Sequence, residues 1–283
     1  MPRFFLPAGA VDGGHAVIEG ADAAHLARSL RARPGERVVV VEAGGVEHGV
    51  VLENVEPGCA RGRVEWSRPP TGEPRARVHV LQALPAEGMD AAVEALAEVG
   101  AAEIWPVLSR RTVARPAPER AARRLERWGA IAREAAALAG RAAPVPVHPP
   151  RRLGDALAAL PPGTRVLACA TGAGAPLAAV EGDGRPLALV IGPEGGLAPE
   201  EVAAIVAAGG EEVHLGPRVL RARLAGAVAV GVLLARLGEL DTALSPPPRD
   251  AVCSGGRLSS ASPSFADDGL GESPHRARQR PEK

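Results

Sequence analysis

The chain has 283 residues, of which 46% are hydrophobic and 23% are charged. This length and balance are typical of a globular protein, and two domains are the better expectation than one. Basic and acidic side chains number 33 each, so no global excess of positive charge points to a nucleic-acid partner. Any nucleic-acid surface must therefore come from charges that are concentrated locally.

The three cysteines, Cys59, Cys169 and Cys253, lie far apart and form no CxxC pair. This spacing argues against a disulfide framework or a metal site, and it favours the reducing cytoplasm. The longest apolar run covers residues 224–235 and stops at Arg236, whereas a membrane-spanning helix needs roughly 20 residues. We therefore expect a cytoplasmic protein with no metal and no membrane partner.

Residues 1–66 have the pattern of a small β-rich domain. β-Branched residues cluster on both sides of Gly44-Gly45, which predicts a hairpin, and a third segment alternates between apolar and polar residues. A helix is expected over residues 21–32, because Pro34-Gly35 follows as a stop signal. The predicted strands cover residues 38–41, 49–52 and 60–66.

Residues 67–75 read as a linker because they are dense in proline and glycine. Strands and helices then alternate, which predicts a mostly parallel sheet with helices on both faces. Asp90 is expected to cap the first of these helices and Gly100 to end it. Strands are predicted over residues 78–83, 103–108, 165–170, 187–191 and 212–215, and helices over 90–99, 119–140, 199–208 and 224–240.

Beyond about residue 244 the chain is rich in proline, glycine and serine, with almost no apolar periodicity. Such a segment cannot bury enough apolar surface to offset the entropy lost on ordering. The sequence therefore predicts a β-rich domain at 1–66, a linker at 67–75, an α/β domain at 76–243 and a disordered tail at 244–283.

Two loops that contain glycine and proline follow strands of the predicted sheet, one at residues 191–196 and one at 215–221. Glycine permits unusual backbone angles and proline stiffens the turn. Because ligands of such sheets bind beyond the carboxyl ends of strands, the loops are expected to form a ligand site. Taken alone, the first loop is also compatible with a simple strand–helix connection. Glu194 is likewise compatible with a purely structural role near a helix amino terminus.

Other chemistry finds little support in the sequence. Residues 171–174 invite a dinucleotide-binding interpretation, but the third glycine and a suitably placed acidic residue are missing. No Gly-Lys pair exists, which excludes a phosphate-binding P-loop. Neither paired carboxylates nor a Ser-His-Asp set is evident, so hydrolysis is poorly supported.

Nine arginines and three glutamates fall between residues 110 and 141, a local excess of positive charge. Most such runs are solvated helix faces, but on a neutral protein this concentration is what a phosphate backbone requires. Four of the arginines share one helix face: Arg120, Arg123, Arg124 and Arg127. A second basic surface is expected near Arg3 and His25, where Phe4 and Phe5 are compatible either with base stacking or with an edge-strand core.

A set of short segments then occurs in one order along the chain, and the last two are the most specific. They are residues 1–5, His25-Leu26, Leu30-Arg31, 98–106, Arg127-Trp128, 134–136, Gly140-Arg141, 191–197 and 215–221. Together they resemble the RsmE-type ribosomal RNA (uracil-N3)-methyltransferases of the SPOUT superfamily, over roughly residues 1–240.

The resemblance implies an α/β fold: a SPOUT-type trefoil-knotted parallel sheet domain with a small N-terminal PUA-like β-barrel domain. Such a knot is an exception to the rule that chains do not thread loops. The implied protein is a homodimer that uses S-adenosyl-L-methionine to methylate N3 of one uridine in 16S rRNA, either free or in the small ribosomal subunit. The methyl donor is a sulfonium cation that needs no metal, so catalysis is mainly alignment.

The resemblance also implies roles for individual residues. Arg221 is the expected catalytic residue, in contact with the target nucleotide or its phosphate. No residue is identified as the base that removes the uracil N3 proton. The cofactor would be bound by Gly192, Pro193, Glu194, Gly195, Gly196, Leu215, Gly216 and Leu220. RNA contacts are expected from Arg3, His25, Arg28, Arg31, Arg123, Arg127 and Arg141.

The chain departs from the family pattern at four positions. Ala86 stands where the family usually has lysine, and Leu138 stands where it has glutamine. Ala222 and Arg223 replace a threonine and a small polar or acidic residue just after the second loop. These departures leave the expected fold intact. They also keep open an alternative, a non-catalytic RNA-binding or ribosome-assembly protein that retains the methyltransferase fold.

Overall fold

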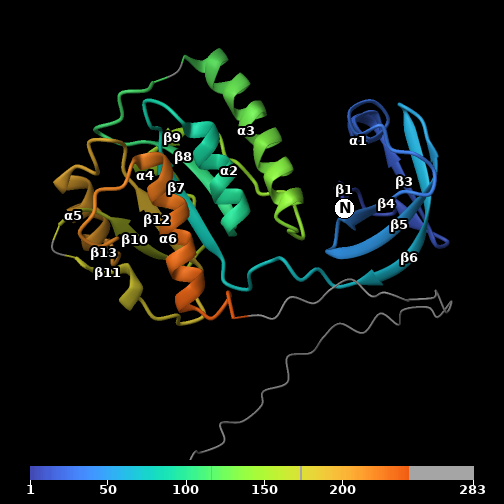
Figure 1. Ribbon diagram of the computed structural model, residues 1–283. Helices are drawn as coiled ribbons and strands as arrows, with labels where there is room; N and C mark the ends of the chain where they lie inside the picture. The colour runs from blue at the N-terminus through green and yellow to red at the C-terminus, as the bar shows by residue number, and fades with distance from the viewer. Residues whose placement is uncertain (116, 173, 242–283) are drawn as a thin grey trace, which may run out of the picture. The chain divides into compact units, whose positions relative to one another are not determined.

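The computed structural model describes residues 1–115, 117–172 and 174–241. The predicted tail at 244–283 lies outside these residues. The described chain contains a six-stranded sheet formed by its N-terminal part and a seven-stranded sheet formed by the part that follows (Figure 1). None of the helices in this described portion is long and apolar enough to cross a membrane.

The N-terminal sheet has the strand order β1-β4-β5-β6-β3-β2. Its strands β4 and β5 are antiparallel and meet at Gly44-Gly45, so the predicted hairpin is confirmed. Strand β1 lies at the edge and pairs in parallel with β4, and its Phe4 and Phe5 are buried, which favours the edge-strand core interpretation over base stacking. The strands are β1 (Arg3–Leu6), β2 (Val11–Asp12), β3 (His15–Glu19), β4 (Arg37–Glu42), β5 (Val46–Val55) and β6 (Cys59–Arg68).

The helix predicted over residues 21–32 is shorter and less regular than expected. Helix α1 (Gly20–Ala24) passes directly into a π-helical turn at His25–Leu30. Arg31 ends this turn in the left-handed region, with φ 52°, and its amide donates to the carbonyl of Leu26. Leu26, which lies in this turn, is buried in the N-terminal core. The 3.6-residue periodicity used to predict the helix does not reveal a π-helical turn.

The second sheet has the order β11-β13-β10-β12-β7-β8-β9, and its strand pairs are parallel, as predicted. The central strands are buried on both faces and consist mostly of β-branched and aliphatic residues, with His79 and Gln82 as buried polar residues of β7. The strands are β7 (Val78–Ala83), β8 (Glu103–Leu108), β9 (Arg151–Arg152), β10 (Arg165–Cys169), β11 (Ala175–Pro176), β12 (Leu187–Ile191) and β13 (Glu211–His214).

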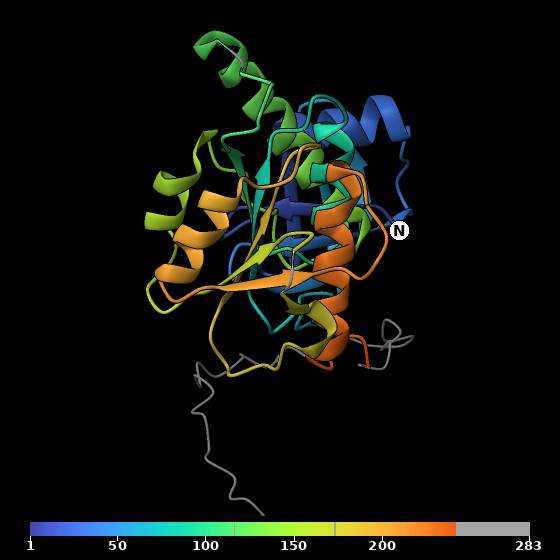
Figure 2. The ribbon, with the colours of Figure 1, turned by 90° about the vertical axis from the view of Figure 1, so that its left-hand side faces the viewer.

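Helices cover both faces of this sheet (Figure 2). Because side chains alternate along a strand, Val78 and Val80 of β7 join a core with α2, α3 and α6, whereas Leu81 and Ala83 pack with α4 and α5. The helices are α2 (Met89–Val99), α3 (Pro118–Leu138), α4 (Leu153–Ala158), α5 (Pro199–Ala207) and α6 (Ala222–Arg236), with one 3-10 turn at Leu177–Ala179.

Asp90 does not cap α2. The helix starts at Met89 after Gly88, whose φ of 80° makes the entry turn, and this places Asp90 inside the first turn. Its carboxylate accepts a hydrogen bond from Trp128 Nε1 at 3.0 Å and pairs with Arg127 Nη2 at 2.6 Å. Asp90 therefore ties α2 to α3, while Gly100 ends α2 with φ 114°, as predicted.

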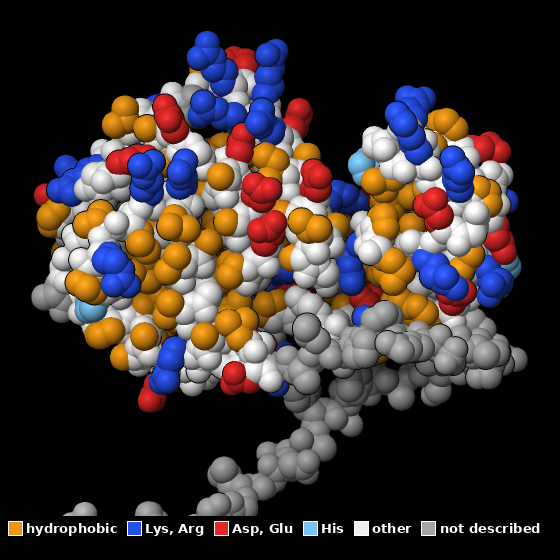
Figure 3. All heavy atoms as spheres, in the orientation of Figure 1, with side chains coloured by type: hydrophobic (Ala, Val, Ile, Leu, Met, Phe, Trp, Pro, Cys, Tyr) orange, Lys and Arg blue, Asp and Glu red, His pale blue; other side chains and the backbone are white. Residues whose placement is uncertain are grey.

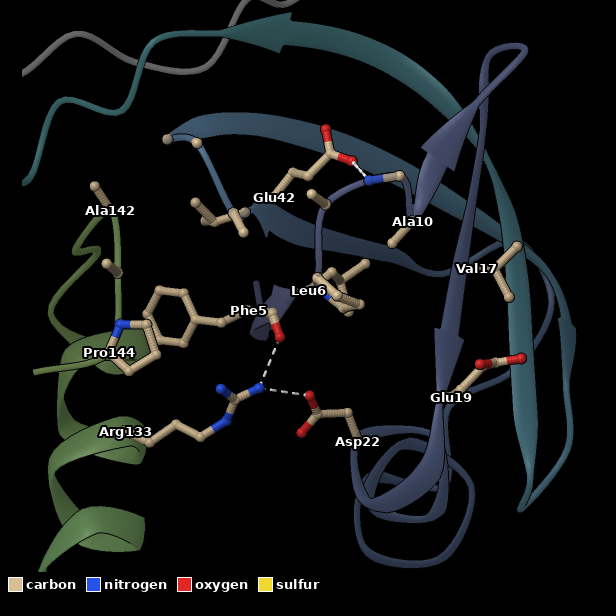
Figure 4. Close-up of a pocket in the computed structure, with 18 of the residues that line it drawn as sticks. Phe5, Leu6, Ala10, Val17, Glu19, Asp22, Glu42, Arg133, Ala142 and Pro144 are labelled. Carbon is tan, nitrogen blue, oxygen red and sulfur yellow. Dashed lines mark hydrogen bonds and ion pairs between the residues drawn. The ribbon is translucent and has the colours of Figure 1, made fainter. Parts of the chain in front are cut away.

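Helix α3 also contacts the N-terminal sheet through Arg133 (Figure 4). Its Nη2 donates to the carbonyl of Phe5 at 2.7 Å and pairs with Asp22 at 2.8 Å. The guanidinium also lies 5.4 Å from the centroid of the Phe5 ring, within the range of a cation–π contact. Three interactions therefore converge on one side chain.

His79 is a fully buried polar residue of β7, and neither of its ring nitrogens has a hydrogen-bond partner. Burial lowers its pKa below the usual 6.5, and Glu103, 3.8 Å from Nδ1, opposes this only in part. The unfolded chain therefore takes up a proton in a pH range where folded His79 stays neutral, and proton uptake by the unfolded state lowers the free energy of unfolding.

We expect the free energy of unfolding to fall as the pH drops below about 6.5, by at most about 1.4 kcal/mol per pH unit for this one proton. His79→Gln removes the group and should reduce the stability lost between about pH 7.5 and pH 5.5. Urea unfolding of both proteins at the two pH values measures the difference. Identical pH dependence in the two proteins would contradict the assignment.

Candidate cofactor site

Three loops at the carboxyl ends of β10, β12 and β13 enclose a cavity of about 570 Å³. These strands are neighbours in the sheet, so their ends meet at one edge. The structure thus brings together the two loops singled out in the sequence, since residues 191–196 and 214–220 line the same space. Residues 169–172 form the third wall.

The loop after β12 is a tight turn in which glycine is needed. A Cβ atom on Gly192 would lie 2.6 Å from the carbonyl carbon of Gly196 and from the amide nitrogen of Leu197. Gly196 and Gly216 have φ of 70° and 86°, in the region that side chains disfavour. The loop therefore lines the cavity largely with backbone, which can approach a ligand closely.

Glu194 is exposed, and its role lies outside the turn itself. Its Oε1 accepts a hydrogen bond at 3.0 Å from the amide of Ala86, in the connection between β7 and α2. This contact fixes the loop at Glu194 to the connection between β7 and α2. The carboxylate therefore orders the cavity wall, one of the two interpretations that the sequence left open.

The third wall, residues 169–172, was not among the predicted site residues. The one sequence signal there is the glycine turn that follows β10, which resembles part of a dinucleotide-binding motif. Burial raises the pKa of the Cys169 thiol to about 12, so this group stays protonated and is unsuited to act as a nucleophile or base. On the opposite wall, His214 Nδ1 accepts a hydrogen bond from the Gly216 amide at 3.0 Å and supports the second loop.

Arg221 stands at the start of α6, and its neighbours Leu220 and Ala222 both line the cavity. Its side chain is exposed and has no hydrogen bond or ion pair to any residue in the described part of the chain. The backbone is occupied, because its carbonyl accepts from the amides of Leu224 and Ala225. Arg221 is thus a free cation held on an anchored backbone beside the cavity.

Five of the seven predicted RNA-contact residues are exposed: His25, Arg28, Arg31, Arg123 and Arg127. Positive side chains gather at the end of α3 in the space-filling view (Figure 3). Arg127 is engaged with Asp90, whereas Arg123 has no partner among the described residues. The arginine strip, by which we mean Arg120, Arg123, Arg124 and Arg127 on one face of α3, is therefore exposed to solvent.

Arg3 and Arg141 correct the prediction. Arg3 pairs with the buried carboxylate of Glu47 at 2.8 Å, and its own side chain is only 13% exposed. Arg141 is 3% exposed, pairs with Glu73, and donates to the carbonyls of Ala97 and Ala101. A buried guanidinium with these partners is committed to packing and is not free for a phosphate.

Two of the family departures lie beside the cavity. Ala222 is buried next to Gln82, whose Nε2 donates to the carbonyls of Ala83 and Ala222, while its Oε1 has no partner. Alanine leaves no side-chain hydroxyl at this position of the cavity wall. Arg223 extends toward Gly88, since a Cβ there would lie 2.9 Å from its Cδ, so it covers the entry turn of α2.

Another cavity, with a volume of about 1180 Å³, lies between the N-terminal sheet and α3 (Figure 4). It is lined by the carboxylates of Glu19, Asp22 and Glu42 against the single guanidinium of Arg133. The Gly44-Gly45 turn lines this cavity, but it joins two antiparallel strands, whereas ligands of α/β proteins bind beyond the carboxyl ends of parallel strands. The strand-end cavity is the better cofactor site.

The model of the family described as RNA methyltransferase domain matches residues 72–234. These residues contain the parallel sheet and the glycine-lined cavity at its strand ends, so the chain is of the RNA methyltransferase class. The ribosomal RNA small subunit methyltransferase E of Mycobacterium bovis is 38% identical over 234 residues, covering 78% of this chain and 86% of that protein. The protein of the same name from Synechocystis is 31% identical, covering 75% and 70%. The chain belongs to the ribosomal RNA small subunit methyltransferase E family.

A solved structure agrees with this assignment. The crystal structure of ribosomal RNA small subunit methyltransferase E from Neisseria gonorrhoeae, bound to S-adenosyl methionine, matches with a TM-score of 0.76 and 28% identity. The match covers 84% of this chain and 98% of that one.

Proposed function

We propose that this protein uses S-adenosyl-L-methionine to methylate N3 of one uridine in the 16S rRNA of the small ribosomal subunit. The observation that carries the proposal is the strand-end cavity, in which residues 191–196 and 214–220 meet. The relatives bear the name of small-subunit rRNA methyltransferases, and one of them was solved with this cofactor. The uridine and its N3 atom come from the resemblance in the two loops.

The cavity suits the proposed cofactor. Its volume of about 570 Å³ lies within the range of small-molecule sites, and its walls are backbone and apolar side chains with few charges. S-adenosyl-L-methionine would be held by Gly192, Pro193, Glu194, Gly195, Gly196, Leu215, Gly216 and Leu220, and it supplies an activated methyl group without a metal. Arg221 would hold the target nucleotide or its phosphate, so that the chain's contribution is mainly alignment.

We also propose the domain division of the sequence: a PUA-like β-barrel at 1–66, a linker at 67–75 and a trefoil-knotted domain at 76–243. The out-of-order strands β13-β10-β12-β7 support the knot. The connection from β10 to β12 also supports the knot. Its Leu177 packs in the same core as α6, and its Gly182 lies close to Leu237, which follows α6 directly.

A cytoplasmic homodimer is part of the proposal. Val219 and Leu224 are 88% and 48% exposed at the edge of the cavity. Apolar residues left in solvent beside a site favour burial against another surface, and a second copy of the chain would provide one.

RNA affinity is expected to fall steeply with salt, and Arg123→Ala with Arg127→Ala should weaken it at low salt. Each lost phosphate contact should also flatten the slope of log affinity against log salt by about 0.7 for single-stranded RNA. Fluorescence titration of an rRNA fragment at several salt concentrations measures both effects. The matched control is Arg236→Ala, an exposed arginine on α6. Binding that does not depend on salt would contradict the arginine surface.

The proposed function is tested by mapping 3-methyluridine in 16S rRNA from a strain that lacks this protein. The mark should disappear and return when the wild-type chain is supplied. Complete retention of the mark would favour the alternative, a non-catalytic RNA-binding or ribosome-assembly protein with the same fold. A loss of methyluridine from a different RNA would identify another substrate.

A further inference from the structure

Arg111, a residue with no role in the proposed function, forms hydrogen bonds with the loop at 192–197. Arg111 Nη1 donates to the carbonyl of Gly195 at 2.7 Å and to that of Leu197 at 3.3 Å. Its aliphatic stem lies over the loop, because a Cβ on Gly195 would be 3.5 Å from Arg111 Cδ. One side chain thus holds two carbonyl groups of the loop backbone.

The backbone around Arg111 is itself fixed. The Ser109 amide donates to Thr112 Oγ1 at 3.0 Å, and the hydroxyls of these residues lie 2.9 Å apart, which closes a short turn after β8. Glu201 Oε1 accepts from the Arg110 amide at 2.8 Å, while its Oε2 accepts from the Ala198 amide at the start of α5. Because the turn is anchored, Arg111 loses little further backbone freedom when it binds the loop.

The loop needs this support because it stands between two cavities. On one side is the proposed cofactor site, and on the other a space of about 710 Å³ lined by Arg111, Gly195, Leu197 and Val202. The two cavities share residues 169–172 as well. On the α5 side the loop therefore faces open space, and the guanidinium of Arg111 is what bridges it.

We propose that Arg111 is a positioning residue, which holds the loop at 192–197 in the shape that the cofactor requires. It binds the loop at Gly195 and Leu197, whereas the Ala86 amide binds it at Glu194. The expected effects on cofactor affinity and KM rest on the proposed function. The effect of Arg111 on the mobility of the loop can be measured without cofactor. Both hydrogen bonds come from one nitrogen, Nη1, so the ammonium of lysine, with three N–H donors on a flexible stem, should replace the guanidinium in part.

Arg111→Ala should weaken the binding of S-adenosyl-L-methionine about tenfold in calorimetry, the effect of losing a charge-assisted hydrogen bond of about 1.4 kcal/mol. Arg111→Lys should restore part of the affinity. The KM for the cofactor should rise while kcat at saturating cofactor stays near wild type, and the unfolding temperature should stay unchanged because the side chain is exposed. Arg152→Ala, an exposed arginine that does not contact the loop, is the matched control.

Hydrogen–deuterium exchange without cofactor separates this inference from the proposed function. Faster exchange of the peptide that spans residues 192–198 in Arg111→Ala, with no change in Arg152→Ala, is expected. Equal exchange in wild type and Arg111→Ala would overturn the positioning role, even if the wild type binds cofactor. Failure of the wild type to bind S-adenosyl-L-methionine, together with faster exchange in the variant, would instead overturn the proposed function and leave the role of Arg111 supported.

Discussion

Arg221→Ala is expected to lower the methylation rate about 100-fold while cofactor affinity changes by less than about twofold. The side chain is exposed at the start of α6 and has no partner in the described part of the chain, so its removal leaves no buried charge unpaired. Its neighbours Leu220 and Ala222 line the cavity, which places it beside the proposed cofactor site. A cation that acts on the nucleotide contributes to the transition state and not to cofactor binding.

Single-turnover rates with an rRNA fragment, combined with calorimetry for S-adenosyl-L-methionine, measure the two effects separately. Arg236→Ala serves as the control, because it removes the same charge from the other end of the same helix. Unchanged turnover in Arg221→Ala would show that this residue is wrongly assigned. A loss of cofactor binding as large as the loss of rate would place Arg221 in the cofactor site instead.

Gly192→Ala is expected to weaken cofactor binding by about 10- to 100-fold, whereas Gly195→Ala should be nearly silent. A Cβ on Gly192 would lie 2.6 Å from two backbone atoms of the same turn, so the loop must open to admit it. Overpacking of this kind costs about 1–3 kcal/mol, which corresponds to the stated loss of affinity. Gly195 meets only the stem of Arg111, at ordinary contact distance.

The two glycine variants form a matched pair, because each adds one methyl group to the same loop. Calorimetry for the cofactor and thermal unfolding should be carried out on both. Equal affinities for the two variants would mean that the tight turn at Gly192 is not needed for binding. A large loss in Gly195→Ala would mean that the cofactor, and not Arg111, occupies the space above that residue.

The central strands were predictable because their signal is local. Strands β7, β8 and β12 are short apolar runs bounded by glycine, proline or charged residues, and their bounds match the prediction. Strand β3 was not predicted, and β1 was anticipated only in one of the two interpretations of Phe4 and Phe5. Each is short, and β1 becomes a strand only by pairing with β4, more than thirty residues away. Helix α4 has six residues, too few for a periodic pattern to be recognised.

The candidate site divides in the same way. The loops after β12 and β13 carry glycine, proline and a charged residue in one short stretch, so sequence could single them out. Whether a given arginine is free depends on distant partners that no local pattern contains. Arg3 finds Glu47 and Arg141 finds Glu73, and both partners come from other parts of the chain. Arg111 was counted only as one charge in a strip, because its acceptors are backbone carbonyls 84 and 86 residues away.

Residues 86–90 contact both the loop that we propose binds the cofactor and helix α3, which carries Arg123 and Arg127. Ala86 holds Glu194 of the cofactor loop, and Asp90 holds Trp128 and Arg127 of the arginine-bearing helix α3. A shift of α3 on binding RNA would therefore reach the cofactor loop through a single turn of chain. Thermodynamic linkage makes such an effect reciprocal: whatever factor RNA imposes on cofactor affinity, the cofactor imposes on RNA affinity.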